Sequence, residues 1–481
     1  MAFSAPSTGV RQALSPANAS NPQFYFWFLA LISAVLLFAP LRTGDLAGYD
    51  DAHYAHIAKA IVVTGNWLDL SSNGGPALEH PPLFVWMQAG LFKLFGFSDT
   101  LARLPSAVCG WGVILLVFWL TRRILNAHAA LLAMFVMAAT IYFLKYAARG
   151  MTDVPFTLIC LAALCAWLLG EDHPAWYLAA GLCVGLAQIT RGLMGIALPI
   201  CFLIDAAVNR RRPSLAYAAG ATALAFFPIT AWYARMFYVN GANFWPIHRA
   251  WLDREALGQL SPPWRRYTGA PEYVWMLLKS YWPWMPFTVA GLWAAIRERE
   301  NGPARSLRLL VIWIGVVFVL CAAAKSRVLR YMLPAYPAFA IMAAIGIQKL
   351  VPERYIWKTL RVLSPVAAAA VAVIAVFPPK NFHATEIRPI AAAATAAIPA
   401  GTRVAFYDEG QPRFDETNQL LWYGDRYLDI LLTPKDLANE LSERGPRVYI
   451  VDRKTYQSQF ASRPHRIVAI SGHLVCLRLL R

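Results

Sequence analysis

Long apolar runs recur along most of this chain, and they limit what it can fold into more than any other feature. A helix needs about 18 or more apolar residues in a row to cross a bilayer. Hydrophobic residues make up 58% of the 481 positions and charged residues only 15%, whereas soluble domains are about 45–50% apolar and 25% charged. The sequence therefore predicts an all-α polytopic membrane protein.

The apolar runs predict about 11 transmembrane helices. The expected spans are residues 24–42, 104–121, 127–145, 153–170, 176–190, 193–209, 214–233, 282–296, 308–325, 331–349 and 361–377. Short loops between them carry clustered basic residues, which favour the cytoplasmic side, so residues 1–23 are expected inside and the C-terminus outside. The net charge of +17 comes mostly from these loops, where basic residues set the topology and contact anionic lipid headgroups. Nucleic acid is therefore not an expected partner.

Two long loops and the C-terminal tail lie outside in this topology. The loops are residues 43–103 and the aromatic-rich residues 234–281, and such aromatic density is typical of the headgroup boundary. Residues 378–481 are more polar and contain a helical stretch near Pro434–Glu443. Their strand-like runs are residues 403–407, 448–451, 467–470 and 474–477. We expect a small periplasmic α/β domain here, beside a membrane domain formed by residues 24–377.

The first outer loop holds the densest group of chemically useful side chains. It begins with Gly48-Tyr49-Asp50-Asp51, and the apolar residues that follow repeat with helical spacing on one side. After Glu79-His80-Pro81-Pro82, the run Leu83–Phe95 predicts a second helix of about 20 Å, too short to cross a bilayer comfortably. Both helices are expected to lie in the membrane interface, where a lipid-linked substrate can present its headgroup to the carboxylates.

Two acidic sites are candidates for acid–base chemistry. Asp50 and Asp51 are adjacent, and neighbouring like charges raise one pKa, which suits a general base. As an alternative, the pair only caps the helix that follows. Asp153 lies at the outer ends of two spans, where an ionisable residue is a functional hypothesis by default, or else it only caps its helix and pairs with Arg149. A two-carboxylate active site needs both acidic sites to meet.

Basic residues at the outer ends of spans depart from the positive-inside bias. Arg191 ends one span, and Lys325, Arg327 and Arg330 precede Tyr331 at another. Three cations within six residues beside a membrane surface suit a phosphate group, and a polyprenyl phosphate supplies one. A snorkelling membrane anchor is the alternative for any one of them.

Histidines in the first loop leave a metal site open. His53 and His56 stand one helical turn apart, and Glu79 adds a carboxylate. These are ligand types that hold a divalent metal ion, although loop histidines more often face solvent. A divalent metal therefore stays open as a cofactor, and no other cofactor is indicated.

Five short motifs occur in an order that resembles one known family. They are Gly48–Tyr54, Glu79–Leu83, Asp153–Pro155, Thr190–Gly192 and Arg330–Pro337. Together they are similar to the bacterial GT-C glycosyltransferases related to protein O-mannosyltransferases and to the lipid A aminoarabinose transferase. The resemblance covers residues 24–345 and implies a GT-C fold with interfacial helices in the first periplasmic loop.

The resemblance also implies roles for individual residues. The family's catalytic carboxylate maps onto Asp50, with Asp51 as its acidic neighbour, and the second acidic site maps onto Asp153. His53 and His80 stand where the family often has arginine and lysine, which weakens charge pairing with phosphate near neutral pH. The positions expected to bind the donor or its phosphate are Tyr54, Glu79, His80, Arg191, Lys325, Arg327, Arg330 and Tyr331.

These implications predict an inner-membrane glycosyltransferase. It would take a hexose or pentose from a polyprenyl phosphate at the periplasmic face, with Asp50 deprotonating the acceptor and Asp51 as the alternate base. The acceptor stays open among a lipid such as lipid A, a glycan and a protein. The alternative is a flippase or transporter for lipid or glycan without transfer chemistry, which needs broken helices or charges near mid-bilayer. A non-catalytic membrane assembly protein is a second alternative.

Overall fold

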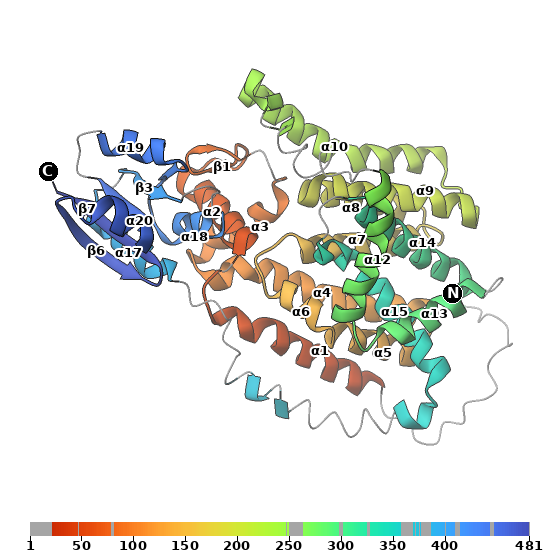
Figure 1. Ribbon diagram of the computed structural model, residues 1–481. Helices are drawn as coiled ribbons and strands as arrows, with labels where there is room; N and C mark the ends of the chain where they lie inside the picture. Colours follow the sequence, from red (N-terminus) through yellow and green to blue (C-terminus); the bar gives the residue numbers. More distant parts are fainter. Residues whose placement is uncertain are drawn as a thin grey trace.

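The protein combines a large helical bundle with a small mixed sheet. The computed structural model describes residues 22–480 apart from residues 47, 78–80, 247, 250–262, 298–301, 325–327, 357–368, 371, 375, 377–385, 400, 409–413 and 443–446. Figure 1 shows the C-terminal sheet region (blue) at one end of the bundle, with α2, α3 and the β1 hairpin between the two.

The bundle is made of helices that follow the apolar runs. Within the described residues, six helical segments are long and apolar enough to cross a membrane, and a seventh is a pair, α5 and α6, bent by 65°. The elements are α1 (Pro22–Phe38), η1 (Ala39–Arg42), α4 (Asp99–Ile124), α5 (Ala127–Ala138), α6 (Ile141–Ala147), α7 (Asp153–Leu169), α8 (Trp176–Arg191), η2 (Gly192–Ile196), α9 (Ala197–Asn209), α10 (Leu215–Asn240), η3 (Gly241–Asn243), α12 (Pro263–Ser280), α13 (Met285–Arg297), α14 (Gly302–Ala323), η4 (Leu329–Ala335) and α15 (Tyr336–Leu350). The chain is a multi-pass membrane protein.

The first ten expected spans each fall on one or more of these helices. The number of long segments is below eleven because α7 has 17 residues and α13 has 13, and because α8 and α9 run together as one helical segment of 34 residues. The last expected span, residues 361–377, lies mostly outside the described residues.

The segment that contains α8 and α9 is a hairpin, not one long helix. The ring of Trp167, at the end of α7, stacks on Phe202 of α9 at 4.5 Å and meets Tyr177 of α8 at 5.0 Å. A straight helix would separate the latter two residues by about 37 Å at 1.5 Å per residue. The chain reverses after Arg191, where Gly192 has φ +58°, a value that glycine adopts readily. The two separate spans expected here are therefore present.

Helices α13 and α15 approach each other closely because glycine faces each backbone. A Cβ atom on Gly291 would lie 1.8 Å from the carbonyl oxygen of Met342, and one on Gly346 would lie 1.9 Å from that of Phe287. Small residues allow membrane helices to pack this tightly. Any larger residue at either position would push the helices apart.

Both short helices expected in the first outer loop are present. They are α2 (Gly48–Thr64) and α3 (Leu83–Phe95), and the hairpin of β1 (Ser71–Ser72) and β2 (Gly75–Pro76) lies between them in the sequence. The second expected outer loop, residues 234–281, is helical over much of its described length. Helix α10 continues into this segment as far as Asn240, and α12 begins at Pro263, while the position of the segment outside the membrane stays a prediction.

The C-terminal region forms a five-stranded sheet in the order β4-β3-β5-β7-β6. Strand β3 is parallel to β4 and β5, and β7 is antiparallel to β5 and β6. Helices α17 and α18 cover one face and α19 covers the other. The elements are α17 (Ile387–Ala397), β3 (Val404–Tyr407), α18 (Phe414–Tyr423), β4 (Leu428–Leu431), α19 (Pro434–Ser442), β5 (Val448–Asp452), α20 (Arg453–Thr455), η5 (Tyr456–Phe460), β6 (His465–Ser471) and β7 (Leu474–Leu479). The expected small α/β unit is present, although β4, α17, α18, α20 and η5 were not predicted.

Candidate functional site

Four charged side chains from four elements meet at the end of the bundle that carries α2. Arg330 of η4 contacts Asp50 of α2 at 2.8 Å (Nη2 to Oδ2) and Asp153 of α7 at 4.0 Å (Nε to Oδ1). Arg191 of α8 donates a hydrogen bond from Nη1 to the same Asp153 oxygen. We call these four residues the acid–arginine cluster. It brings together the two acidic sites that the sequence placed about 100 positions apart.

Helix ends place the charges of this cluster. Asp153 is the first residue of α7 and Arg191 the last of α8, positions where the helix dipole favours a negative and a positive charge respectively. The ring of Tyr331 lies 4.8 Å from the guanidinium of Arg191 and 5.8 Å from that of Arg330. The cluster is buried but not closed: the side chains of Arg191 and Arg330 are 15% and 23% exposed.

The two neighbouring carboxylates in α2 have different surroundings. Burial raises the pKa of Asp50, while the charge of Arg330 opposes that rise and Asp153 adds to it. Burial raises the pKa of Asp51 to about 7, against the charges of Arg149 and Arg103. Within the described residues neither carboxylate oxygen of Asp51 has a well-formed hydrogen bond. Asp50 therefore belongs to the cluster, and Asp51 faces the protein interior beside it.

Tyr54 lies one turn beyond Asp50 on α2 and is 4% exposed. Its ring packs edge-on against Phe84 of α3 at 5.4 Å, and its hydroxyl interacts with Thr152 just before α7. Burial raises its pKa above the usual value for tyrosine, so the hydroxyl stays protonated and can donate a hydrogen bond.

The two histidines of α2 face the C-terminal region. The Nδ1 atom of His53 lies 3.3 Å from Oδ1 of Asn418, and Nε2 of His56 accepts a hydrogen bond from the backbone N–H of Asn73 at 3.2 Å. Among the described residues, no three His, Cys, Asp or Glu side chains are grouped for a metal ion. Glu79, the third proposed ligand, lies outside the described residues. A metal site that includes Glu79 therefore stays a prediction.

Four predicted site residues lie outside the described part of the chain. They are Glu79, His80, Lys325 and Arg327.

Sequence reasoning missed Arg103, which organises the chain just before α2. This side chain is 1% exposed and donates from Nη1 to the carbonyl oxygens of Thr43 at 3.0 Å and Gly44 at 3.2 Å, and from Nη2 to that of Asp45 at 2.5 Å. The available signal was a basic residue on the outer side, directly before the predicted span 104–121, because such a residue departs from the positive-inside bias.

The fold and the cluster define a multi-pass membrane protein of the GT-C class. The structure superposes on the crystal structure of ArnT from Cupriavidus metallidurans bound to undecaprenyl phosphate with a TM-score of 0.75 and 18% identity, over 95% of this chain and 98% of that one. It also resembles the apo oligosaccharyltransferase of Archaeoglobus fulgidus, with a TM-score of 0.61 and 13% identity over 90% and 70% of the two chains. The expected GT-C fold is confirmed.

Sequence comparisons give the more particular relationship. Residues 79–232 match the family model of dolichyl-phosphate-mannose-protein mannosyltransferases. Undecaprenyl phosphate-alpha-4-amino-4-deoxy-L-arabinose arabinosyl transferases are 25% identical in Edwardsiella ictaluri (70% of this chain, 61% of that one) and 26% identical in Shewanella sediminis (72% and 63%). The chain thus spans about three fifths of the length of these curated relatives. The resemblance drawn from the motifs, to the superfamily of protein O-mannosyltransferases and aminoarabinose transferases, is confirmed.

Proposed function

We propose that the chain is a glycosyltransferase that transfers a sugar from a polyprenyl phosphate to an acceptor at the periplasmic face of the bacterial inner membrane. The observation that carries this proposal is the acid–arginine cluster: two carboxylates and two guanidiniums from α2, α7, α8 and η4 in one partly exposed group. The named relatives, which are arabinosyl transferases of undecaprenyl phosphate-linked sugars, support it.

In the proposed reaction, Asp50 takes the proton of the acceptor hydroxyl. The acceptor oxygen then forms a bond to the anomeric carbon of the sugar, and the bond from that carbon to the phosphate oxygen breaks. The polyprenyl phosphate leaves with the bonding electron pair, so its phosphate gains negative charge as the reaction proceeds. Cations placed where charge develops lower the barrier of such a step.

Arg330 and Arg191 are the described cations that we assign to this phosphate. Arg330 contacts Asp50 at 2.8 Å, so a bound phosphate would compete with Asp50 for its guanidinium. The positive charge of Arg330 lowers the pKa of Asp50, and a weaker contact between the two side chains would reduce this lowering. Asp50 would thus become a stronger base when the donor is in place. Arg191 stays paired with Asp153, which we propose shapes the pocket for the sugar and the acceptor.

The remaining assignments are proposals of the same kind. Tyr54 and Tyr331 border the cluster and would contact the donor. Glu79, His80, Lys325 and Arg327, which lie outside the described residues, would add further donor contacts. The acceptor is a lipid such as lipid A, a glycan or a protein, and the C-terminal α/β region lies on the periplasmic side with the cluster.

The test is sugar transfer by the purified protein in lipid vesicles. Wild-type protein given a polyprenyl-phosphate-linked sugar and an extract of envelope lipids should yield a glycosylated product and free polyprenyl phosphate, both detected by mass spectrometry. Asp50→Asn should bind the donor but turn over about 10²–10⁴ times more slowly, because a general base contributes about that factor. Full transfer by this variant would remove the proposal. Movement of the donor across the vesicle membrane without covalent change would favour the transporter alternative.

A further inference from the structure

Helix α18 of the C-terminal region holds the peptide groups that lead into α2. The hydroxyl of Tyr423 accepts a hydrogen bond from the backbone N–H of Leu46 at 2.6 Å. The side-chain amide of Gln419 donates to the carbonyl oxygen of the same residue at 2.8 Å. Leu46 is fully buried and lies four positions before Asp50. The backbone N–H and the carbonyl oxygen of Leu46 are therefore both bound by α18, and a buried peptide group left without a partner destabilises the folded state.

A third contact from α18 reaches the face of α2 that carries Asp50. Nδ1 of His53 lies 3.3 Å from Oδ1 of Asn418. An amide oxygen can only accept, so the histidine donates from Nδ1, and this fixes where its proton sits. His53 is one turn from Asp50 and is among the groups that influence its charge. A change in the position of α18 would therefore shift the acid–arginine cluster through His53 as well as through Leu46.

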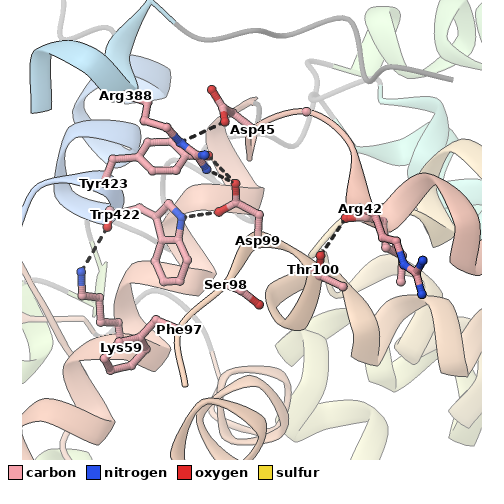
Figure 2. A pocket seen from close by; sticks show the side chains of 12 residues that line it. Arg42, Asp45, Lys59, Phe97, Ser98, Asp99, Thr100, Arg388, Trp422 and Tyr423 are labelled. Atoms are coloured by element: carbon pink, nitrogen blue, oxygen red, sulfur yellow. Dashed lines mark hydrogen bonds and ion pairs between the residues drawn. The ribbon is translucent and has the colours of Figure 1, made fainter. Parts of the chain in front are cut away.

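Asp99, the first residue of α4, anchors α18 on the other side. Figure 2 shows the carboxylate of Asp99 facing Trp422, Tyr423 and Arg388. These residues line a cavity of about 530 Å³ at the junction. The indole Nε1 of Trp422 donates to Asp99 at 2.8 Å and the Tyr423 hydroxyl donates at 3.0 Å. Arg388 contacts both Asp99 and Asp45, at 2.5 and 3.1 Å. The Tyr423 hydroxyl therefore links the start of α4 to the chain entering α2.

We propose that α18 is a positioning element of the transfer site: Gln419, Tyr423 and Asn418 set the place of Asp50 relative to Asp153 and Arg330. This inference rests on the proposed function for its effect on turnover, but not for the contacts themselves. A displacement of about 1 Å in a catalytic group can cost 10²-fold in rate. The three residues touch Leu46, His53 and Asp99, so their role is to hold α2 and not to contact substrate.

Other contacts keep the C-terminal region attached when these are removed. Lys59, near the far end of α2, pairs with Asp425 at 2.5 Å. Asn73 of the hairpin exchanges two hydrogen bonds with the backbone of Leu428, at 2.9 and 2.8 Å. A variant at Tyr423 can therefore loosen the start of α2 without releasing the whole region. This makes the proposal testable in the full-length protein.

The experiment compares Tyr423→Phe and Gln419→Ala with Tyr456→Phe in vesicles. Tyr423→Phe keeps the ring, which lies 4.5 Å from the Arg388 guanidinium, but loses the hydroxyl. Tyr456→Phe is the matched control, because its hydroxyl bonds to His465 within the C-terminal region at 2.9 Å. We expect kcat to fall about tenfold or more in both test variants, with the Kd for polyprenyl phosphate within twofold of wild type, and no change in the control. Turnover of Tyr423→Phe equal to the control, or parallel losses in kcat and phosphate binding, would overturn the proposal.

A second readout does not depend on transferase activity. Hydrogen–deuterium exchange in the peptide that contains Leu46 should be faster in Tyr423→Phe than in wild type and unchanged in Tyr456→Phe. If the wild-type protein transfers no sugar, the proposed function fails while this exchange result still decides whether α18 fixes the start of α2. Equal exchange in all three proteins would contradict the positioning role directly.

Discussion

Buried carboxylates meet arginines at both ends of α7, but the two clusters differ in how completely they are closed. At one end lies the acid–arginine cluster of Asp50, Asp153, Arg191 and Arg330. At the other lies an Asp205 cluster, in which Oδ2 of Asp205 binds Nε1 of Trp167 at 2.7 Å and Nε of Arg211 at 2.6 Å, while Oδ1 binds Asn209 at 2.5 Å.

The difference in exposure supports the proposed binding role of the acid–arginine cluster and a structural role for the Asp205 cluster. The side chains of Asp205 and Arg211 are 0% and 1% exposed, so the Asp205 cluster has no surface for a substrate. It joins α7, α9 and the loop after it, and Arg308 extends it to α14 with a hydrogen bond to Asn209 at 2.8 Å. The arginines of the acid–arginine cluster are 15–23% exposed, which leaves donor capacity for a phosphate.

The largest expected effect is on turnover, at the more open cluster. Asp153→Asn keeps the size of the side chain but removes the charge that Arg191 and Arg330 share. We expect kcat for sugar transfer to fall about 10³-fold, the upper end of the loss seen when one preorganised electrostatic group is removed from an active site, with the folded fraction unchanged. Steady-state kinetics in vesicles measures this. A variant with wild-type kcat would mean that the two clusters do not differ in the way described.

The closed cluster should show the reverse pattern. Asp205→Ala removes one of the two carboxylates that pair with the buried guanidinium of Arg211 and leaves Glu171 at 2.7 Å, and breaking a buried ion pair costs about 3–5 kcal/mol. We expect the free energy of unfolding in mixed micelles to fall by that amount, while kcat per folded molecule stays at the wild-type value. A selective loss of kcat with normal stability would assign Asp205 to the chemistry instead.

Asp51, the carboxylate of α2 that lies outside the cluster, should make the stability of the protein depend on pH. The pKa of Asp51 is about 7 in the folded protein against 3.8 for the free side chain, so the folded state binds the proton more tightly than the unfolded state. The contribution of Asp51 to the free energy of unfolding is therefore greatest below pH 4 and decreases as the pH rises to 7. At 1.36 kcal/mol per pKa unit, the total decrease is about 4 kcal/mol.

Asp51→Asn should accordingly gain stability relative to wild type as the pH increases. Unfolding measured at pH 5 and pH 8 should show the advantage of the variant growing by about 1.4 kcal/mol per pH unit up to pH 7. Asp436→Asn is the control, because the pKa of this exposed carboxylate is already lowered and both states are ionised across that range. A constant difference for Asp51→Asn would contradict the raised pKa.

The smallest expected effect concerns phosphate affinity. Arg330→Gln should weaken binding of polyprenyl phosphate about 10- to 100-fold, the effect of losing one hydrogen bond to a charged group. Arg308→Gln, which alters an arginine beside the Asp205 cluster, should leave that affinity unchanged. Equilibrium binding to vesicles or micelles containing polyprenyl phosphate distinguishes the two. Equal effects of both substitutions would point to a general loss of surface charge.

Local sequence patterns predicted the elements that depend on local chemistry. The bounds of α3 were predicted correctly because Pro81 and Pro82 precede the helix and Gly96, with φ +84°, ends it. The expected meeting of Asp50 and Asp153 followed from topology, which places the end of the first span and the start of the fourth on the same side of the membrane.

Long-range contacts were not predictable in the same way. Arg103 binds carbonyl groups 58 to 60 positions away, and Tyr423 binds Leu46 across 377 positions. Neither partner carries a sequence signal, because a backbone carbonyl or N–H is present at every non-proline residue. Residues 428–431 were missed as a strand since only pairing with β3 identifies this short segment. The docking of α18 on α2 was missed for the same reason.

The most direct test of the account is a cryo-electron microscopy structure of the full-length protein in a lipid nanodisc with polyprenyl phosphate. The account predicts the phosphate against the guanidiniums of Arg330 and Arg191, at hydrogen-bond distances of about 3 Å, with Asp50 and Asp153 facing the same space. Phosphate density bound elsewhere, with Arg330 still paired to Asp50 and the acid–arginine cluster unchanged, would contradict it.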